Sequence, residues 1–228
     1  MQFQDILGRL KALSNPESAR GTARFGINPE NNYGICIPDL RKLAREIGVD
    51  HALALQHWKS AVHEAHIPAS MIDVPGLVTQ QQMDSWVKDF ESWNVCYQCC
   101  GNLSERTEFI YQKAVSWKSH QWGFIKRAGL AMMVCLAHHD ARAAEEAFAA
   151  FVLIIKSQST DDRNFVKKTI NWALRQIGKR SPGLNSIAIE TAEEIQEVDS
   201  KSAQWIASDA IRELTGKAAQ ETLRRFSS

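Results

Sequence analysis

The stretch FIKRA at residues 124–128 decides the fold, because it recurs 41 residues later as FVKKT at 165–169. Both copies carry an aromatic residue, an aliphatic residue and two basic residues in the same order. A period near 40 residues with paired helices is the size of a HEAT or armadillo repeat. In such a solenoid corresponding helices pack side by side and line one concave surface. The repeat therefore predicts basic side chains at 126–127 and 167–168 on neighbouring inner helices; the alternative is a chance match of five residues.

The remaining sequence is dominated by apolar residues three and four apart, which is the period of an amphipathic helix. Glycine and proline cluster at three joints, 26–29, 74–76 and 181–183. We expect helices at 38–47, 50–58, 61–72, 80–89, 105–117, 121–138, 143–156, 162–178 and 202–214. No segment has the alternation of a strand, and about ten short helices are too many for a four-helix bundle. The sequence predicts an all-α fold in a single domain, 1–228.

The composition is that of an ordinary globular protein, with 27 basic residues against 26 acidic ones, so net charge alone indicates no partner. No apolar run approaches the roughly 18 residues that a membrane helix needs, and the N-terminus lacks the apolar core of a signal peptide. Five cysteines, an odd number, suit free thiols in a reducing compartment. Phosphate-loop, dinucleotide and nucleophile-elbow motifs are absent. We expect a cytoplasmic monomer without a cofactor and without membrane contact.

The expected helix 162–178 shows an aromatic residue among cations. At about 100° per residue, its apolar stripe consists of Val166, Ile170, Ala173, Leu174 and Ile177. Trp172 falls on the opposite side, beside Lys168, Arg175 and Lys179. Such a surface suits a phosphate backbone, with the cations on the phosphates and the ring on a sugar or base. Further basic residues precede it, namely Lys113, Lys118, Lys126 and Arg127. The alternative is that Trp172 packs beneath a neighbouring helix and the cations are a solvated face.

The stretch SWNVCYQCC at 92–100 concentrates three thiols in nine residues. Cys96 and Cys99 have C-x-x-C spacing, but a zinc site needs a second pair or two suitably spaced histidines, and Cys36 and Cys135 stand alone. A redox pair belongs near a βαβ unit, which this chain lacks. We therefore expect the thiols to be small packing residues. On the same helix face, Phe90, Trp93 and Tyr97 are expected to form an aromatic surface.

The histidines of His63-Glu64-Ala65-His66 are one residue too close for the H-E-x-x-H zinc motif, which needs two imidazoles one helical turn apart. We therefore expect helix-terminal or packed histidines, and no metal site anywhere in the chain.

Four segments carry a resemblance to a known family. They are YGICIPDLRKLAREIG (33–48), SWNVCYQCCGNL (92–103), FIKRAGLAMM (124–133) and DDRNFVKKTINWALRQIGKRSPGLN (161–185). They resemble the bacterial DNA alkylation repair enzymes built from HEAT-like repeats, over roughly residues 30–215. The resemblance implies a C-shaped α-α superhelix whose basic concave face grips duplex DNA. It also implies a monofunctional glycosylase that removes positively charged N3- or N7-alkylpurines.

The family site that this resemblance implies contains a Trp-Asp-x-x-Asp motif, an Arg on a later helix and a second Trp. Trp93 matches the first Trp, Arg127 the Arg and Trp172 the second Trp. Asn94 and Tyr97 stand where the motif has aspartates, and Tyr97 occupies the position of the catalytic carboxylate. The DNA contacts that we expect come from Lys126, Lys167, Lys168, Arg175 and Lys179.

The exchange at Tyr97 has a chemical consequence. A carboxylate stabilises the oxocarbenium-like sugar that forms as the alkylated purine leaves, and it orients the attacking water. A phenol with a reference pKa of about 10 is uncharged at neutral pH. If the carboxylate supplies roughly 3 kcal/mol, its loss costs about a hundredfold in rate. We therefore predict DNA binding with weak or lost glycosylase activity.

Two alternatives remain open. In one, the chain is an active glycosylase in which Asp89, Glu91 or Asp73 supplies the negative charge. About 12 Å of helix rise between positions 89 and 97 argues against a simple substitution by Asp89. In the other, the solenoid binds a protein rather than DNA.

Overall fold

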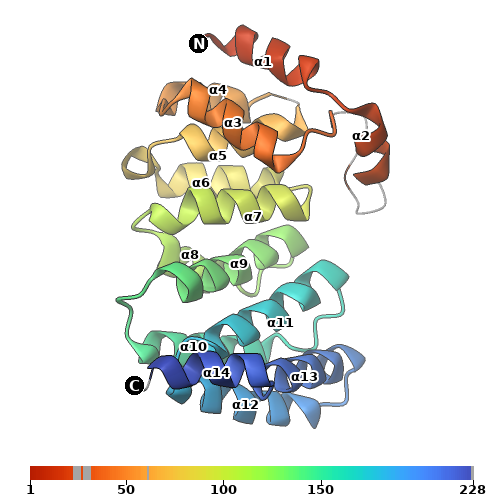
Figure 1. The fold of residues 1–228 in the computed structure, drawn as a ribbon, viewed down its shortest axis with the longest axis vertical. Helices are drawn as coiled ribbons and strands as arrows, with labels where there is room; N and C mark the ends of the chain where they lie inside the picture. The colour runs from red at the N-terminus through yellow and green to blue at the C-terminus, as the bar shows by residue number, and fades with distance from the viewer. Residues whose placement is uncertain (23–26, 28–31, 61, 227–228) are drawn as a thin grey trace. The chain divides into compact units, whose positions relative to one another are not determined.

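The computed structural model describes residues 1–22, 27, 32–60 and 62–226, and within these ranges the chain is helical, without a strand (Figure 1). It forms two compact units, Met1–Ile110 and Tyr111–Ser228. The joint expected at 26–29 lies outside the described residues except for Ile27, which is buried. The prediction of one domain stays a prediction. No helix in the described part of the chain is both long and apolar enough to cross a bilayer.

The first unit contains α1 (Phe3–Ala12), α2 (Pro16–Thr22), α3 (Ile37–Ile47), α4 (His51–Trp58), α5 (His66–Ile72), α6 (Gln80–Trp86) and α7 (Trp93–Asn102). Short 3-10 helices lie between them: η3 (His63–Ala65), η4 (Pro75–Leu77), η5 (Val87–Asp89) and η6 (Ser104–Arg106). Side chains fix several helix starts, because Asp50, Thr79 and Ser92 each accept a hydrogen bond from a backbone N–H of the first turn. Helix α5 packs between α3 and α7, and also against α4.

The second unit contains α8 (Ile110–Trp117), α9 (Gly123–His139), α10 (Glu145–Ser157), α11 (Asn164–Gly178), α12 (Pro182–Gln196), α13 (Lys201–Leu214) and α14 (Lys217–Phe226). Helices α9, α11 and α13 pack in succession, while α12 packs against α10, α11 and α13. The two copies of the repeat meet directly, since the rings of Phe124 and Phe165 stack with centroids 4.6 Å apart. The prediction that corresponding helices lie side by side is therefore confirmed for α9 and α11.

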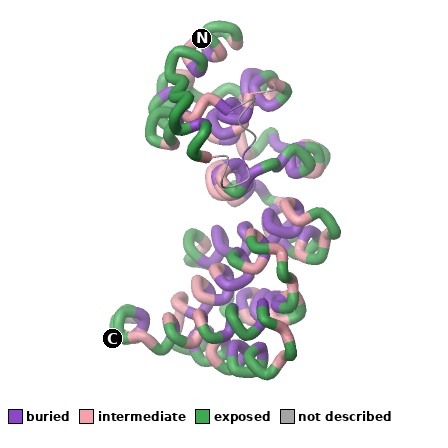
Figure 2. Tube along the Cα trace, turned by 90° about the vertical axis from the view of Figure 1, so that its right-hand side faces the viewer, coloured by how far each residue is buried: buried purple, intermediate pink, exposed green. Residues whose placement is uncertain are grey.

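Buried positions recur along each helix, with exposed positions between them (Figure 2). Helix α9 differs, since every residue from Ile125 to Ala137 is buried. This range includes Lys126 and Arg127, so two predicted DNA-facing side chains start from a helix that is enclosed by its neighbours.

Most expected helices are present, with boundaries shifted by a few residues. The helix expected at 105–117 is too long, because it begins at Ile110 after the separate turn η6. The Thr107 hydroxyl donates to the Ser104 carbonyl at 2.8 Å, a local bond that competes with helix continuation. Helix α12 is not among the expected helices, because Pro182 and Gly183 indicate a joint; in the structure Ser181 caps this helix and Pro182 is its first residue. Helices α1, α2 and α14 were also missed.

Candidate nucleic-acid interface

Helix α7 presents Trp93 and Tyr97 on the first unit. Ser92 caps the helix by accepting from the Val95 N–H at 3.3 Å, which places Trp93 at the first helical position with 46% of its surface exposed. Asn94 joins the same cap, because its Oδ1 accepts from the Val95 N–H at 2.9 Å. Tyr97 is half-buried one turn later. Position 94 is therefore a capping residue, and Tyr97 is partly open to solvent.

The thiols of α7 lie on its packed side. Cys96, Cys99 and Cys100 are buried and carry no disulfide. Burial raises the pKa of the Cys99 thiol well above its usual range. The prediction that these cysteines are packing residues is confirmed. Across the described residues, no group of three or more metal-ligating side chains could hold a metal ion.

The three acids considered as substitutes for the missing aspartate lie in different environments. Asp73 is buried and is hydrogen-bonded to the His51 imidazole and to the Gln82 amide. It serves the packing of α4 against the loop after α5. Asp89 and Glu91 are exposed, and Asp89 accepts from the Trp58 indole N–H at 2.8 Å. Only these last two are accessible to another molecule.

In the second unit, Arg127 ties α9 to α11. Its guanidinium is buried and donates to the Phe165 carbonyl and to the Thr169 hydroxyl. No carboxylate of the described residues pairs with it, and its Nε has no hydrogen-bond partner there. Arg127 is therefore a structural residue whose positive charge is balanced only by neutral dipoles.

The neighbouring Lys126 is neutralised by an acid. It is 7% exposed and its Nζ lies 2.7 Å from Asp161, which Arg163 also contacts. Burial alone raises the pKa of Asp161, but hydrogen bonds from Arg163 and Lys126 outweigh burial and lower it to about 2. The expectation that Lys126 is an accessible cation is wrong, because its ammonium group is buried in an ion pair with Asp161, from the segment before α11.

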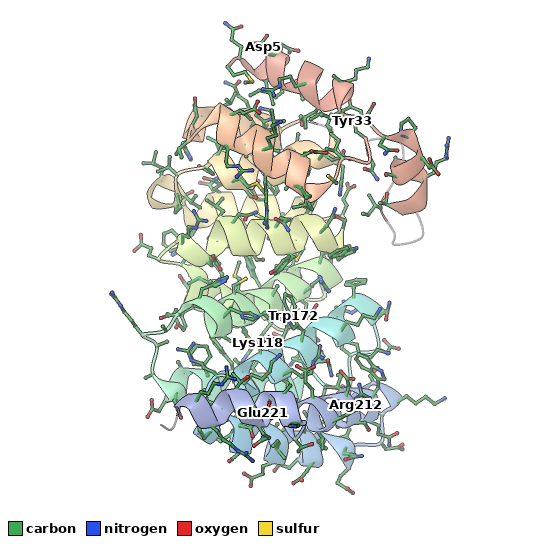
Figure 3. All side chains as sticks on the ribbon, viewed as in Figure 1. Asp5, Tyr33, Lys118, Trp172, Arg212 and Glu221 are labelled. Atoms are coloured by element: carbon green, nitrogen blue, oxygen red, sulfur yellow. The ribbon has the colours of Figure 1, made fainter. Side chains whose placement is uncertain are left out.

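Helix α11 confirms the predicted apolar stripe: its five residues are fully buried. Trp172, labelled in Figure 3, is half-buried. With the Gln176 amide oxygen directed toward them, Gln176 accepts from the Trp172 indole N–H at 3.2 Å and from Lys179 Nζ at 3.0 Å. The Gln176 side chain thus links the Trp172 ring to Lys179 on the same helix.

The cations beside Trp172 are not equivalent. Arg175 contacts Glu213 and, at 3.5 Å, Asp209, while Lys179 lies 2.7 Å from Glu213. These acids come from α13, the next helix in the row, so Arg175 and Lys179 are ion-paired and do not form the solvated cationic face of the alternative interpretation. Their expected contact with DNA stays a prediction. Sequence analysis missed both acids, although their spacing of four residues on one helix marks a common face.

The remaining basic residues also differ. Lys168 is exposed, and no ion pair holds it within the described residues. Lys167 is half-buried with its Nζ 5.2 Å from the centre of the Trp205 ring. Lys113, expected as part of the basic surface, is buried over the Trp117 ring at 5.6 Å, whereas Lys118 is half-buried. Lys168 is thus the most accessible cation of the predicted set.

The four residues that the resemblance assigns to the site form two pairs. Trp93 and Tyr97 share α7 in the first unit, and Arg127 and Trp172 lie on the adjacent helices α9 and α11 in the second. Each pair is held by neighbours in its own unit.

Comparison with known proteins adds the family. The model of the DNA alkylation repair enzyme family matches residues 6–214. A solved structure described as "a new family of proteins related to the HEAT-like repeat DNA glycosylases with affinity for branched DNA structures" is similar at a TM-score of 0.78. The identity is 17%, over 93% of this chain and 95% of that chain, so this likeness establishes the HEAT-like repeat fold. No curated protein matches. From the family match over nearly its whole length, this chain belongs to the DNA alkylation repair enzyme family.

Proposed function

We propose that this protein binds DNA, duplex or branched, and that its N-glycosylase activity toward N3- and N7-alkylpurines is weak or absent. Membership of the DNA alkylation repair enzyme family supports the DNA ligand. The similar structure belongs to proteins described as having affinity for branched DNA, which supports a ligand other than an intact duplex. We further propose a cytoplasmic location and a monomeric state; the five free cysteines support the reducing compartment.

The observation that carries the proposal is the phenol at position 97. Helix α7 contains no Asp or Glu between Trp93 and Asn102. The family chemistry needs a fixed negative charge beside the sugar as the base departs. An uncharged phenol stabilises that cation far less, so the expected loss in rate is about a hundredfold or more.

The groups that support binding are two partly exposed indoles and a positive charge. Trp93 and Trp172 have accessible ring surface, which suits stacking on a base or a sugar. Lys168 is accessible, and the buried Arg127 keeps a charge that no carboxylate of the described residues cancels. Arg175 and Lys179 share Glu213, so they attract a phosphate less strongly than free cations.

The experiment compares the natural chain with Tyr97→Asp and Tyr97→Asn. Release of 7-methylguanine from methylated duplex is measured, and binding to duplex and to a four-way junction is titrated against salt. We expect release by Tyr97→Asp alone, because Asn has the shape of Asp without its charge. All three proteins should bind DNA with affinity that falls as salt rises.

Two results would contradict the proposal. Release by the natural chain at the rate of Tyr97→Asp would show an active enzyme that uses another acid. Absence of binding to both DNA forms at low salt would favour the protein-binding alternative.

A further inference from the structure

A polar pocket of about 440 Å³ lies in the first unit and includes Asp89 and Glu91, two of the acids considered above. The end of α4, the His63–His66 segment, the end of α6 and residues 89–91 form its wall. Its chemically distinctive residues are Trp58, His63, His66, Trp86, Asp89 and Glu91. None of the proposed DNA contacts belongs to this group.

A stack of three rings makes one side of the pocket rigid. The Trp58 and Trp86 rings lie parallel with centroids 3.9 Å apart, and His66 stacks on Trp58 at 4.5 Å. The Trp58 indole N–H donates to Asp89, and the His66 Nε2 lies 3.1 Å from the Trp58 carbonyl. Because aromatic rings cover both faces of Trp58, this indole cannot stack on a flat ligand.

The charge of the pocket is negative. Asp89 and Glu91 are exposed, and no lysine or arginine of the described residues forms an ion pair with either of them. Lys59 also lines the pocket as an exposed side chain, so two carboxylates face one ammonium group. Burial lowers the pKa of His63 to about 4 and also lowers the pKa of His66, so both rings are neutral at pH 7.

His63 supplies an unused hydrogen-bonding atom. The side chain is 8% exposed, and its Nε2 has no partner in the described part of the chain. A hydrogen bond with Asn94 raises the pKa of His63 against the effect of burial, as expected when the imidazole N–H donates to the amide oxygen. The neutral ring then presents Nε2 as an acceptor. An acceptor left without a donor in a buried position is costly, and a ligand N–H removes that cost.

We propose that this pocket binds an organic cation with several N–H donors, namely an ammonium or a guanidinium group. Asp89, Glu91 and His63 Nε2 supply three acceptors, two of them charged, and a charged donor forms its strongest hydrogen bonds with carboxylates. The ring edges of the stack suit the aliphatic stem of such a ligand. An anion would be repelled by the two carboxylates. A metal ion does not fit either, because no group of three or more His, Cys, Asp or Glu side chains in the described residues could hold one.

The cation has two sources that share this chemistry: a free polyamine, or an arginine or lysine side chain of a protein. Calorimetric titration with agmatine, spermidine and a short peptide with one internal arginine distinguishes them. Tighter binding of the peptide identifies a protein side chain, and tighter binding of the free amines identifies a small molecule. 7-Methylguanosine is the fourth probe, since it is a flat cation that would require an open aromatic face.

The variant Asp89→Asn/Glu91→Gln removes the charge and keeps the shape, and its matched control is Glu17→Gln/Glu108→Gln, which removes two exposed charges of the same unit. We expect the Kd for agmatine to rise at least about tenfold in the first variant and to stay unchanged in the second. Binding should also shift the ring ¹⁵N resonances of His63, and His63→Phe should weaken it.

Three results would overturn the proposal. They are the absence of saturable binding by agmatine, spermidine and the peptide, equal affinity of the two double variants, and tighter binding of 7-methylguanosine than of agmatine. Because none of these measurements uses DNA, they leave the proposed DNA-binding function untouched.

Discussion

The two units differ in how far their charges are paired, although the first unit also has an ion pair between helices, Arg9 with Glu46. In the second unit, cations on one helix meet acids that belong to the next part of the chain, as in Lys126 with Asp161 and Arg175 with Glu213. In the first unit, the accessible acids Asp89 and Glu91 have no cationic partner in the described residues, and the buried polar groups include neutral histidines. A count of basic residues therefore overstates the charge that the second unit offers to a phosphate. The ion pairs between repeats decide how much positive charge stays available to a phosphate.

The largest expected difference between the units is their response to acid. His57 is fully buried with neither ring nitrogen hydrogen-bonded in the described residues, and burial lowers its pKa to about 4, as it does for His63. The unfolded chain, with a histidine pKa near 6.5, binds more protons between pH 6.5 and about 4. Stability of the first unit therefore falls as the pH falls through this window, by on the order of 3 kcal/mol for the two histidines together at pH 4, because partial solvation screens the effect of burial.

In the second unit, Asp161 makes stability depend on pH in a more acidic range. Its folded pKa of about 2 lies below the ordinary carboxyl value of 3.8, so its contribution to stability is present above pH 3.8 and is lost between pH 3.8 and 2. Hydrogen exchange at pH 7, 5 and 4, corrected for intrinsic rates, should show amides of α4 and α5 losing protection before those of α11. His57→Leu should reduce the loss in the first unit, whereas His139→Gln should not. Parallel loss in both units would contradict this account.

The second-largest expected effect is the loss of stability in Arg127→Ala. The resemblance assigns Arg127 to the DNA site, but its buried guanidinium also donates to the Phe165 carbonyl and to the Thr169 hydroxyl. Its removal breaks both of these bonds and leaves a void between α9 and α11, although the Thr169 hydroxyl still donates to the Phe165 carbonyl. We expect a loss of about 3 kcal/mol in the free energy of unfolding. Urea denaturation measures it, with the exposed Arg142→Ala as the matched control. Equal stability of the two variants would show that Arg127 does not join α9 to α11.

The sequence was sufficient for what depends on local pattern. Period, capping residues and the copies at 124–128 and 165–169 predicted an all-α repeat fold, and the stripe of α11 predicted which side is buried. The thiols of α7 were predicted to be packing residues for the same reason. These properties follow from a side chain's position on its own helix.

The sequence was insufficient where two distant segments decide the outcome. Glu213 lies 38 residues after Arg175, and nothing in the helix period of α11 shows that α13 brings this acid to it. Likewise, His63 and Asp89 are 26 positions apart, and only the fold places them in one pocket wall. The roles of Trp93, Tyr97, Arg127 and Trp172 in DNA binding stay predictions.

The smallest expected effect is the most direct test of cross-repeat pairing. Glu213→Gln removes the negative charge shared by Arg175 and Lys179 while keeping the side chain's size. If these cations contact DNA, the variant should bind about three- to tenfold more tightly at about 0.1 M salt, with a steeper dependence on salt. Lys179 becomes available to phosphates, and Arg175 keeps only its longer contact with Asp209. The matched control is Glu194→Gln, which releases the exposed Lys156. Equal gains in both variants would indicate a general effect of net charge, whereas no gain in either would place the DNA contacts away from Arg175 and Lys179.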